Sequence, residues 1–417
     1  MDAMYDLIII GAGPAGLAAG IYGGRAHLNT LILEKSTVGG RAYTTREIVN
    51  YPGIPSTSGP DLTEKMAEHA KSFGVEIKRE PVKSMDVTGD VKLVKTRRHE
   101  YGAKAVIIAT GTSARILGIP GERELTGQGV AYCATCDAEF FQDQHVVVVG
   151  SGDQAIEEGM FITKFANRVT VIVLHDEGIL DCNKQAAEKA LSHPKMDFIW
   201  NSVLTEVCGE KQVTGVKIKN MKTDEITDFP CDGVFFFVGM IPETKWLPEE
   251  LYKDGRGWLH VNEQMETNIS GVYAVGDVRD KYLRQVSTAI ADGAIAATAA
   301  ERYIEDMDYF REKVIESETP VVLGFWSPEY AGSIDAIGAI SSPYPVMEID
   351  VTRKKAWADR YHIELSQEGI DAKVDVSEMM GSTVHLHVTA MGRDVVLVVS
   401  TMNMTGAEVA ALTAGAA

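Results

Sequence analysis

The stretch Cys133-Ala134-Thr135-Cys136-Asp137 holds the residues of this chain that are best suited to chemistry. Two cysteines separated by two residues can open and close as a disulfide, because one thiolate attacks a disulfide and the other resolves the product. Asp137 stands beside them, and a carboxyl group can give or take the proton that accompanies the electrons. The pattern predicts a site that moves two electrons and a proton.

A Cys-x-x-Cys pair can also bind a metal ion, so the other ligands of the chain matter. Structural zinc normally takes four ligands, and no second Cys or His pair lies nearby in the sequence. The chain has five cysteines, and the remaining three are scattered: Cys182, Cys208 and Cys231. We therefore expect no metal site and interpret these three as buried small apolar residues.

A first glycine-rich loop lies far upstream of the cysteines. The run Tyr5-Asp6-Leu7-Ile8-Ile9-Ile10 predicts a buried parallel strand, and it leads into Gly11-Ala12-Gly13-Pro14-Ala15-Gly16 and an alanine-rich helix. The next strand, 30–33, ends in Glu34. Glycines in this setting let the backbone approach a pyrophosphate at a helix N-terminus, and an acid about 20 residues later can bind a ribose. The segment predicts a dinucleotide site.

The same pattern repeats shortly after the cysteines. A valine strand at 146–149 leads into Gly150-Ser151-Gly152-Asp153-Gln154-Ala155, a helix to about residue 165 and a strand at 169–172. Further on, 271–277 is another apolar strand that ends in Gly276-Asp277. We interpret the second pattern as a nucleotide-binding unit inserted within the first.

Composition sets the broad class. A length of 417 residues predicts two to four domains, and 45% apolar with 24% charged residues is typical of a soluble globular protein. The net charge of -19 argues against nucleic-acid binding, which needs a basic face. No apolar run approaches the ~20 residues of a membrane helix, and no signal peptide precedes the first strand, so we expect a cytoplasmic protein.

Residues 5 to about 312 resemble the low-molecular-weight thioredoxin reductases, which are FAD-dependent disulfide reductases. The matching segments follow the family's order: Gly11 to Gly16, Gly39-Gly40-Arg41, Asn50-Tyr51-Pro52-Gly53, Ala109-Thr110-Gly111, Cys133 to Asp137, Gly276-Asp277 and Arg284-Gln285-Val286. The resemblance implies an α/β fold of two nested Rossmann-like domains. It places an FAD-binding domain at 1–118 and 246–312, and an inserted pyridine-nucleotide-type domain with the cysteines at 119–245. It also implies a homodimer and a thioredoxin-like protein as substrate.

The resemblance further implies a role for each matching residue. The expected FAD contacts are Gly11, Gly13, Pro14, Ala15, Gly16, Glu34, Lys35, Gly40, Arg41, Asn50, Ala109, Thr110, Gly111, Gly276, Asp277, Arg284, Gln285 and Val286. The loop glycines and Glu34 also follow from the residues themselves, whereas Asn50, Asp277 and Gln285 rest on the resemblance alone. By the same resemblance Cys136 faces the flavin and accepts its electrons, and Cys133 attacks the substrate disulfide.

One part of the family's pattern is missing. NADPH-dependent members carry arginines after the second strand of the inserted domain, where they bind the 2′-phosphate. Here that window is Val173-Leu174-His175-Asp176-Glu177-Gly178-Ile179, which has no arginine and two carboxylates that repel a phosphate. An NADH enzyme would place an acid where Val173 stands, unless Asp176 curls back into that role. We expect a donor other than NADPH: reduced ferredoxin, reduced deazaflavin or NADH.

A separate module is predicted at 319–417. Residues 320–326 resemble the strand that leads into the active site of thioredoxin, 345–351 its next strand, and 384–388 with 395–399 a hairpin around a turn at 391–394. A last helix is expected at 405–412, with Thr405 as N-cap. No cysteine follows Cys231, and Ser382-Thr383 replaces the usual proline, so we expect a redox-silent thioredoxin-like domain. This domain would serve as a docking or dimer-stabilising element, or it would imitate thioredoxin and occupy or gate the site at which thioredoxin binds.

These observations predict an FAD-dependent thioredoxin-disulfide reductase. Two alternatives stay open at this point. One is a dithiol oxidase of the same fold, which passes electrons from a small dithiol through the cysteines and FAD to oxygen. The other is a non-catalytic binding or scaffold protein built on a retired reductase.

Overall fold

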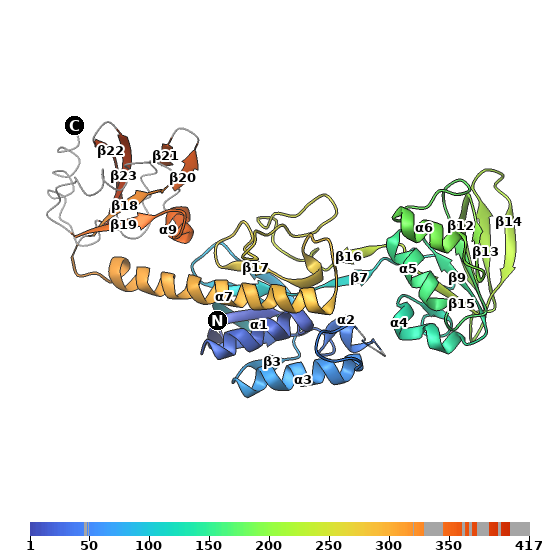
Figure 1. Cartoon of the computed structure of the whole chain (residues 1–417). Coiled ribbons are helices and arrows are strands. Elements are labelled where there is room, and N and C mark those ends of the chain that lie inside the picture. Colours follow the sequence, from blue (N-terminus) through green and yellow to red (C-terminus); the bar gives the residue numbers. More distant parts are fainter. Residues whose placement is uncertain are drawn as a thin grey trace.

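The computed structural model describes residues 1–45, 48, 50–319, 321–328, 345–360, 363–366, 369–372, 383–390 and 393–400, with the backbone alone at 135–136, 364–372 and 383–400. Figure 1 shows three parts, which we name by their elements. The first unit comprises β1 to β7 with β16, β17 and α7. The inserted unit comprises β8 to β15, and the C-terminal module comprises β18 to β23. The inserted unit and the C-terminal module lie at opposite ends of the first unit (Figure 1).

The first unit is built on a seven-stranded sheet of order β3-β2-β1-β6-β5-β4, in which β17 also pairs with β6. The strands are β1 (Ala3–Ile10), β2 (Thr30–Leu33), β3 (Glu76–Lys78), β4 (Val82–Asp86), β5 (Lys92–Thr96), β6 (Glu100–Ile108) and β17 (Val272–Ala274). β1, β2, β3, β6 and β17 are parallel, and β4 and β5 form an antiparallel edge. Two distant chain segments therefore complete one sheet.

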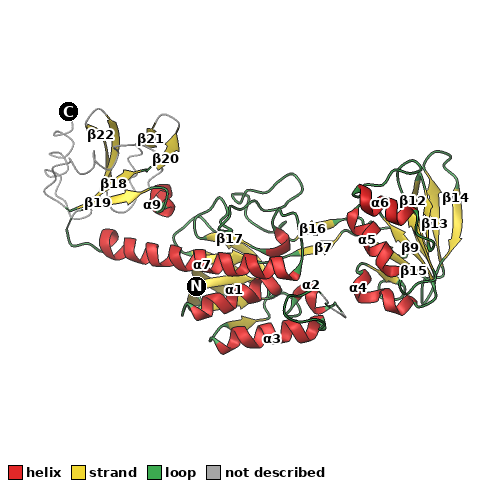
Figure 2. Ribbon diagram, in the orientation of Figure 1, coloured by secondary structure: helices red, strands yellow, loops and turns green. Residues whose placement is uncertain are grey.

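Helices α1 (Pro14–Arg25), α3 (Gly59–Ser72) and α7 (Val286–Phe310) cover one face of this sheet (Figure 2). Leu7 and Ile9 of β1 point into their shared core. α1 and α7 pack closely because Gly293 has no side chain: a Cβ there would lie 2.1 Å from the carbonyl oxygen of Ala15. A short helix, α2 (Gly40–Tyr43), follows β2, and Ile8 and Ile10 pack against the opposite core.

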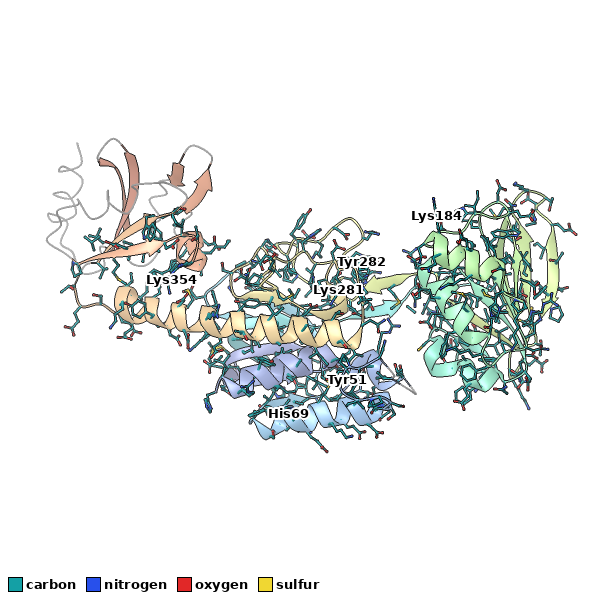
Figure 3. The ribbon with its side chains drawn as sticks, in the orientation of Figure 1. Tyr51, His69, Lys184, Lys281, Tyr282 and Lys354 are labelled. Atoms are coloured by element: carbon teal, nitrogen blue, oxygen red, sulfur yellow. The ribbon has the colours of Figure 1, made fainter. Side chains whose placement is uncertain are left out.

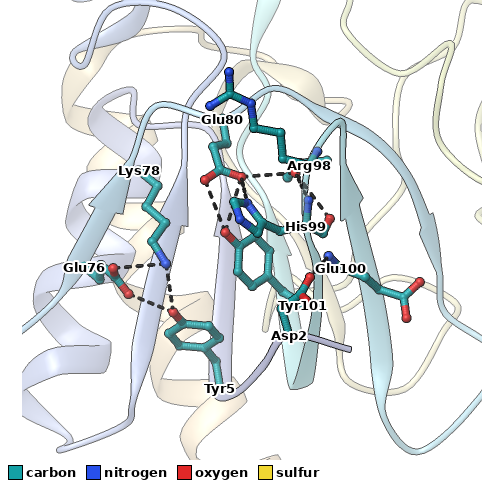
Figure 4. Close-up of polar contacts among 10 residues, drawn as sticks. Asp2, Tyr5, Glu76, Lys78, Glu80, Arg98, His99, Glu100 and Tyr101 are labelled. Atoms are coloured by element: carbon teal, nitrogen blue, oxygen red, sulfur yellow. Dashed lines mark hydrogen bonds and ion pairs between the residues drawn. The ribbon is translucent and has the colours of Figure 1, made fainter.

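Polar side chains on β1, β3 and β6 form a network away from the glycine loop (Figure 4). Tyr5 donates to Glu76 at 2.7 Å, and Lys78 pairs with Glu76 at 3.0 Å. Glu80 accepts from Tyr101 at 3.3 Å. The groups of this network satisfy one another.

The inserted unit has a five-stranded parallel sheet of order β11-β10-β9-β15-β8. Its strands are β8 (Val130–Ala131), β9 (His145–Val149), β10 (Arg168–Ile172), β11 (Met196–Ile199) and β15 (Gly233–Phe236). Its helices are α4 (Ala134–Asp137), α5 (Asp153–Ile162) and α6 (Lys184–Leu191), with a 3-10 turn at Ala138–Phe141. An antiparallel sheet of β12 (Ser202–Cys208), β13 (Gly215–Asn220) and β14 (Ile226–Pro230) completes it. α5 ends earlier than expected, because the chain turns at Thr163.

A two-stranded antiparallel ribbon joins the two units. β7 (Thr112–Ala114) pairs with β16 (Met240–Pro242) between the sheets (Figure 1). The α/β fold class with Rossmann-like sheets is thus confirmed. Among the described residues no helix is both long and apolar enough to cross a membrane.

The C-terminal module is built on the end of α7. A π-helical turn (Arg311–Ile315) continues α7, and Phe310 and Val314 enter one core with Trp357 of α9 (Lys355–Arg360). The sheet order is β19-β18-β23-β22, from β18 (Val322–Trp326), β19 (Val346–Asp350), β22 (Thr383–Ala390) and β23 (Arg393–Ser400), and β20 (Ile363–Ser366) pairs with β21 (Gly369–Ala372).

The predicted hairpin in this module is confirmed as β22 and β23. Arg393 and Asp394 belong to β23, however, because Arg393 pairs with Ala390, so the connection is shorter than the predicted turn. The expected helix at 405–412 and the position of Ser382 lie outside the described residues. The thioredoxin-like assignment stays a prediction.

Candidate active site

The first glycine loop lies where β1 ends and α1 begins. Gly11 has φ +112, and a Cβ there would lie 2.3 Å from the carbonyl oxygen of Ala109. A Cβ on Gly16 would lie 1.9 Å from the Gly11 carbonyl oxygen, whereas one on Gly13 would meet nothing within 4 Å. Gly13 is the N-cap of α1, and Pro14 is the first residue of that helix, followed by Ala15. The loop is tightly packed on its protein side and open at Gly13.

Glu34 stands at the end of β2, next to this loop. Its side chain is buried, and one carboxylate oxygen accepts the backbone N–H of Ala12 at 2.7 Å. The other oxygen accepts the N–H of Ser36 at 2.8 Å. These bonds hold the carboxylate at the edge of the sheet, next to the N-terminus of α1. In dinucleotide-binding folds an acid at this position binds a ribose diol.

Two further predicted segments reach the same edge. Ala109-Thr110-Gly111 follows β6, and Gly276-Asp277 follows β17; both strands are parallel to β1. The carboxyl ends of parallel strands meet at one edge, which explains why segments so far apart in sequence converge. The hydroxyl oxygen of Thr110 is buried with no hydrogen-bond partner among the described residues. An unpaired buried hydroxyl of this kind fits a site that a polar ligand completes.

Charged residues surround Gly276-Asp277. Burial raises the pKa of the Asp277 carboxyl, although Lys281 and Arg41 act in the opposite direction. Burial lowers the pKa of Arg41, whose guanidinium donates to the hydroxyl of Thr112 at 3.2 Å. Lys281 is labelled in Figure 3, and its side chain is 5% exposed.

Asp292 is a residue that the sequence interpretation missed. It lies on α7, is buried, and accepts the backbone N–H of Gly276 at 2.9 Å. It also pairs with Arg279 at 2.8 Å and Lys281 at 2.7 Å. Its position inside the alanine-rich sequence of α7 could have indicated it. A carboxylate that is buried with such a helix needs charged partners.

The remaining predicted contacts lie around the start of α7 and α2. Asn50 donates to the side chain of Gln285 at 3.1 Å, so the structure brings these two residues together. Gln285 is the N-cap of α7, with Val286 as its first residue, and Arg284 stacks on Trp258 with 3.9 Å between the guanidinium carbon and the ring centre. Lys35 pairs with Glu243 at 3.0 Å instead of facing the loop, and Gly40 begins α2.

The cysteine turn lies in the inserted unit. Cys133 is the extended N-cap of α4 and is disulfide-bonded, whereas Cys182, Cys208 and Cys231 are free. Asp137, at the end of α4, donates its N–H to the Cys133 carbonyl at 3.2 Å, and burial raises the pKa of its carboxyl. The side chain of Cys136 lies outside the described residues. An acid with a raised pKa beside a disulfide suits proton transfer to a leaving thiolate.

The three free cysteines were expected to be buried. This is right only for Cys231, where burial raises the thiol pKa to about 12; Cys182 and Cys208 are half-buried. Such raised pKa values keep a thiol protonated and unreactive.

The second glycine loop has a different surrounding. Gly150 has φ +124 and Gly152 is the N-cap of α5, and a later segment of the chain runs beside this loop: Gly152 forms a parallel β-bridge with Asp181. The Asp181 carboxylate accepts from Ser151 at 2.8 Å and pairs with His175 at 2.8 Å. The hydrogen bonds from Ser151 and His175 lower the pKa of Asp181, so the group is charged at neutral pH.

A second carboxylate lies beside this loop, and a third follows β10. Asp153, the first residue of α5, accepts from the backbone N–H of Asn183 at 2.7 Å and from its side chain at 2.9 Å. Asp176 pairs with Lys222, and that bond lowers the pKa of Asp176. The backbone geometry of a dinucleotide loop is therefore present, but carboxylates of the chain itself occupy its surroundings.

Comparison with known proteins identifies the fold. The family "Pyridine nucleotide-disulphide oxidoreductase" matches residues 5–293. The chain is 47% identical to a thioredoxin reductase of Peptoclostridium acidaminophilum over 312 residues, 73% of this chain and 98% of that protein. The chain belongs to this family, among the thioredoxin reductases.

Other thioredoxin reductases agree. The Bacillus subtilis protein is 42% identical over 307 residues, 73% of this chain and 96% of that one. The crystal structure of the Lactococcus lactis thioredoxin reductase in its FR conformation has a TM-score of 0.63 and 41% identity, and covers 72% of this chain and 99% of that one. Thioredoxin reductases of this family are FAD-dependent flavoproteins, and the first loop, with its open Gly13 and buried Glu34, fits such a dinucleotide.

Proposed function

We propose that this protein reduces the disulfide of a thioredoxin-like protein, passing electrons through FAD and a Cys133/Cys136 pair. The observation that carries the proposal is the Cys-x-x-Cys-Asp turn, held in a unit inserted between the two halves of a dinucleotide-binding fold. We assign the FAD-binding domain to 1–118 and 246–312, the inserted domain to 119–245, and a thioredoxin-like module to 319–417.

The first loop is the proposed FAD site, and bound FAD, once reduced by the donor, would supply the two electrons. The N-terminus of α1 would bind the pyrophosphate at Gly11, Gly13 and Gly16, because its free N–H groups and helix dipole favour an anion. Glu34 would accept hydrogen bonds from the ribose. The proposed contacts along the rest of the cofactor are Pro14, Ala15, Lys35, Gly40, Arg41, Asn50, Ala109, Thr110, Gly111, Gly276, Asp277, Arg284, Gln285 and Val286.

The cysteine turn is the proposed relay. Cys136 would accept the two electrons as its bond to Cys133 breaks, which leaves two thiolates. Cys133 would then attack the substrate disulfide, forming a mixed disulfide and releasing one substrate thiolate. Cys136 would attack Cys133, release the second thiolate and restore the disulfide. Asp137 would donate a proton to a leaving thiolate, which its raised pKa supports.

The donor is proposed to be something other than NADPH: reduced ferredoxin, reduced deazaflavin or NADH. Two observations support this. The window 173–179 has no arginine for a 2′-phosphate. Asp181 packs against the second loop, at the place where a pyrophosphate would need open N–H groups. Carboxylates at this position repel phosphate charge, and NADPH carries a 2′-phosphate that NADH lacks.

An anaerobic titration tests the donor. The purified flavoprotein is mixed separately with NADPH, NADH, reduced ferredoxin and reduced deazaflavin, and the loss of flavin absorbance is followed. We expect NADPH to be the slowest nucleotide; rapid bleaching by NADPH would overturn the donor assignment and leave the reductase assignment untouched.

A second experiment tests the reductase itself. Chemically reduced protein is mixed with an oxidised thioredoxin, and the free thiols of the thioredoxin are counted. The wild type should reduce it and Cys133→Ser should not. Equal reduction by Cys133→Ser would refute the relay, and peroxide formation from small dithiols in air would indicate the dithiol oxidase instead.

The assembly and the C-terminal module complete the proposal. We propose a cytoplasmic homodimer, in which the module is a docking or dimer-stabilising element. The described part of the module lies away from the cysteine turn of its own chain, at the far end of α7, where the Phe310–Trp357 core and an ion pair of Arg360 with Asp90 at 2.6 Å hold it (Figure 1). This position counts against gating of the site within one chain.

A further inference from the structure

Glu158 is a partly buried acid next to the cysteine turn with no role in the scheme above. It lies on α5, between the exposed Glu157 and the buried Gly159. Its Oε2 atom is shielded from solvent and has no hydrogen-bond partner among the described residues. Because an ionised carboxylate is unfavourable in such a position, burial raises the pKa of Glu158.

The carboxyl group of Glu158 is connected to the cysteine turn through the backbone. It accepts a hydrogen bond from the N–H of Ala134, the residue that follows Cys133 and begins α4. A hydrogen bond to that N–H places the carboxyl oxygen within about 5 Å of the Cys133 Cα atom. A charge on Glu158 is therefore a close neighbour of any charge on Cys133.

Two other charged groups act on Glu158. Glu157 beside it raises its pKa, and Arg41, from α2 of the first unit, lowers it. The elements that pack against α5 also carry charged or titratable groups: Asp137 on α4, Glu139 on the 3-10 turn, Lys184, Glu188 and Lys189 on α6, His145 on β9 and Arg168 on β10. The charge of Glu158 is thus set mainly by its burial.

We propose that Glu158 is a positioning residue for the Cys133–Asp137 turn, which holds the Ala134 N–H as a neutral acid and weakens the Cys133 thiolate when it ionises. The sign follows from electrostatics. A rise in pH through the pKa of Glu158 adds a negative charge beside Cys133, and a like charge disfavours the thiolate. Less thiolate means slower attack on a disulfide. The proposal rests on the proposed function only in taking Cys133 as the nucleophile.

The test measures the reactivity of Cys133 without donor or thioredoxin. The full-length holoprotein is reduced by excess dithiol under argon and freed of it, and iodoacetamide alkylation of the peptide containing Cys133 is timed by mass spectrometry from pH 5 to 10, roughly the range in which thiols titrate. The variants are Glu158→Gln, which cannot ionise, and Glu158→Ala, which also loses the hydrogen bond. Glu157→Gln is the matched control on the adjacent, exposed position.

We expect Glu158→Gln to match the wild type at low pH. It should be alkylated about three- to tenfold faster at pH values above the pKa of the wild-type Glu158 and below that of the Cys133 thiol. The two rates should converge again once Cys133 is fully ionised in both proteins. Glu157→Gln should stay within about twofold of the wild type at each pH, because its charge is exposed. Identical pH profiles for Glu158→Gln and the wild type, or slower alkylation of Glu158→Gln, would overturn the proposal.

Glu158→Ala separates charge from folding. We expect it to show the same gain in alkylation rate as Glu158→Gln but to lower the melting temperature, since the Ala134 N–H loses its partner. Should it show the lower melting temperature without the gain, Glu158 is merely structural and the proposal is wrong. Failure of the wild type to reduce thioredoxin would refute the proposed function, yet these alkylation profiles would still decide the role of Glu158.

Discussion

The two glycine loops of this protein have the same backbone geometry and differ in the residues that surround them. Both follow a buried parallel strand, both begin with a glycine at positive φ, and both lead into a helix N-terminus. At the first loop a single acid, Glu34, binds the loop backbone from the side and Gly13 stays open. At the second loop Asp181 hydrogen-bonds to Ser151 within the loop itself. The comparison teaches that two loops with the same backbone geometry can be surrounded by different charges.

The strongest way to break this comparison is to close the first loop. Gly16→Val should abolish flavin binding, because even a Cβ at Gly16 would lie 1.9 Å from the Gly11 carbonyl oxygen. Gly152→Ala is the control at the second loop, since a Cβ there meets nothing within 4 Å. Flavin per protein after purification is the measurement. A yellow Gly16→Val protein would contradict the assignment of the first loop.

The next effect concerns the charges behind the first site. Asp292→Ala should lower the free energy of unfolding by about 3 kcal/mol, because it leaves the buried Lys281 and Arg279 without their shared carboxylate. It should also weaken flavin binding, since the Gly276 N–H loses its acceptor. Denaturant unfolding and flavin release measure the two effects. Asp280→Ala, on an exposed neighbouring acid, is the control and should change neither.

The cysteine turn lies between the two loops in sequence, and its acid predicts a pH dependence. Asp137→Asn should slow thioredoxin reduction about 100-fold. Because burial raises the pKa of Asp137, the wild type holds the proton at low pH and loses it as the pH rises through that pKa, so its rate should fall on the alkaline side. The variant should lack that decline, and a rate unchanged by the substitution would remove Asp137 from the mechanism.

The smallest expected effect concerns the hydrogen bond between Ser151 and Asp181 at the second loop. A double-mutant cycle of Ser151→Ala and Asp181→Ala should give a coupling energy of about 1 kcal/mol or less, since Asp181 is exposed. The pKa of Asp181 is lowered in the fold, so this contribution is present above the unfolded pKa and is lost as the pH falls below about 4. Thermal unfolding at pH 7 and pH 3 measures it. Zero coupling at pH 7 would mean that Asp181 does not hold the loop.

The sequence predicted the parts of the site that depend on local backbone. The strand 30–33 is found as β2, and the loop Gly11 to Gly16 lies between β1 and α1, because apolar runs and glycine spacing determine these features locally. Contacts between residues far apart in the chain could not be predicted from the sequence. Asp292 reaches Gly276 from the next helix, and Asp181 folds back over Gly152; neither contact has a spacing rule. Likewise the predicted strand at 271–277 is only Val272–Ala274, since Gly271 and Gly276 adopt positive φ.

The pairing of β17 with β6, and of α7 with α1, has a consequence for biosynthesis. The ribosome delivers β1, α1 and β6 early, but their partners β17 and α7 emerge only after the whole inserted unit, between residues 272 and 310. The inserted unit needs nothing downstream of Phe236 to close its parallel sheet, so it can fold while the outer sheet waits with the apolar side of α1 uncovered. A nascent chain stalled once β15 has left the ribosome should thus hold a folded, cysteine-bearing inserted unit, while the first unit still lacks β17 and α7. Exposed apolar surface of this kind is what makes such an intermediate prone to aggregation.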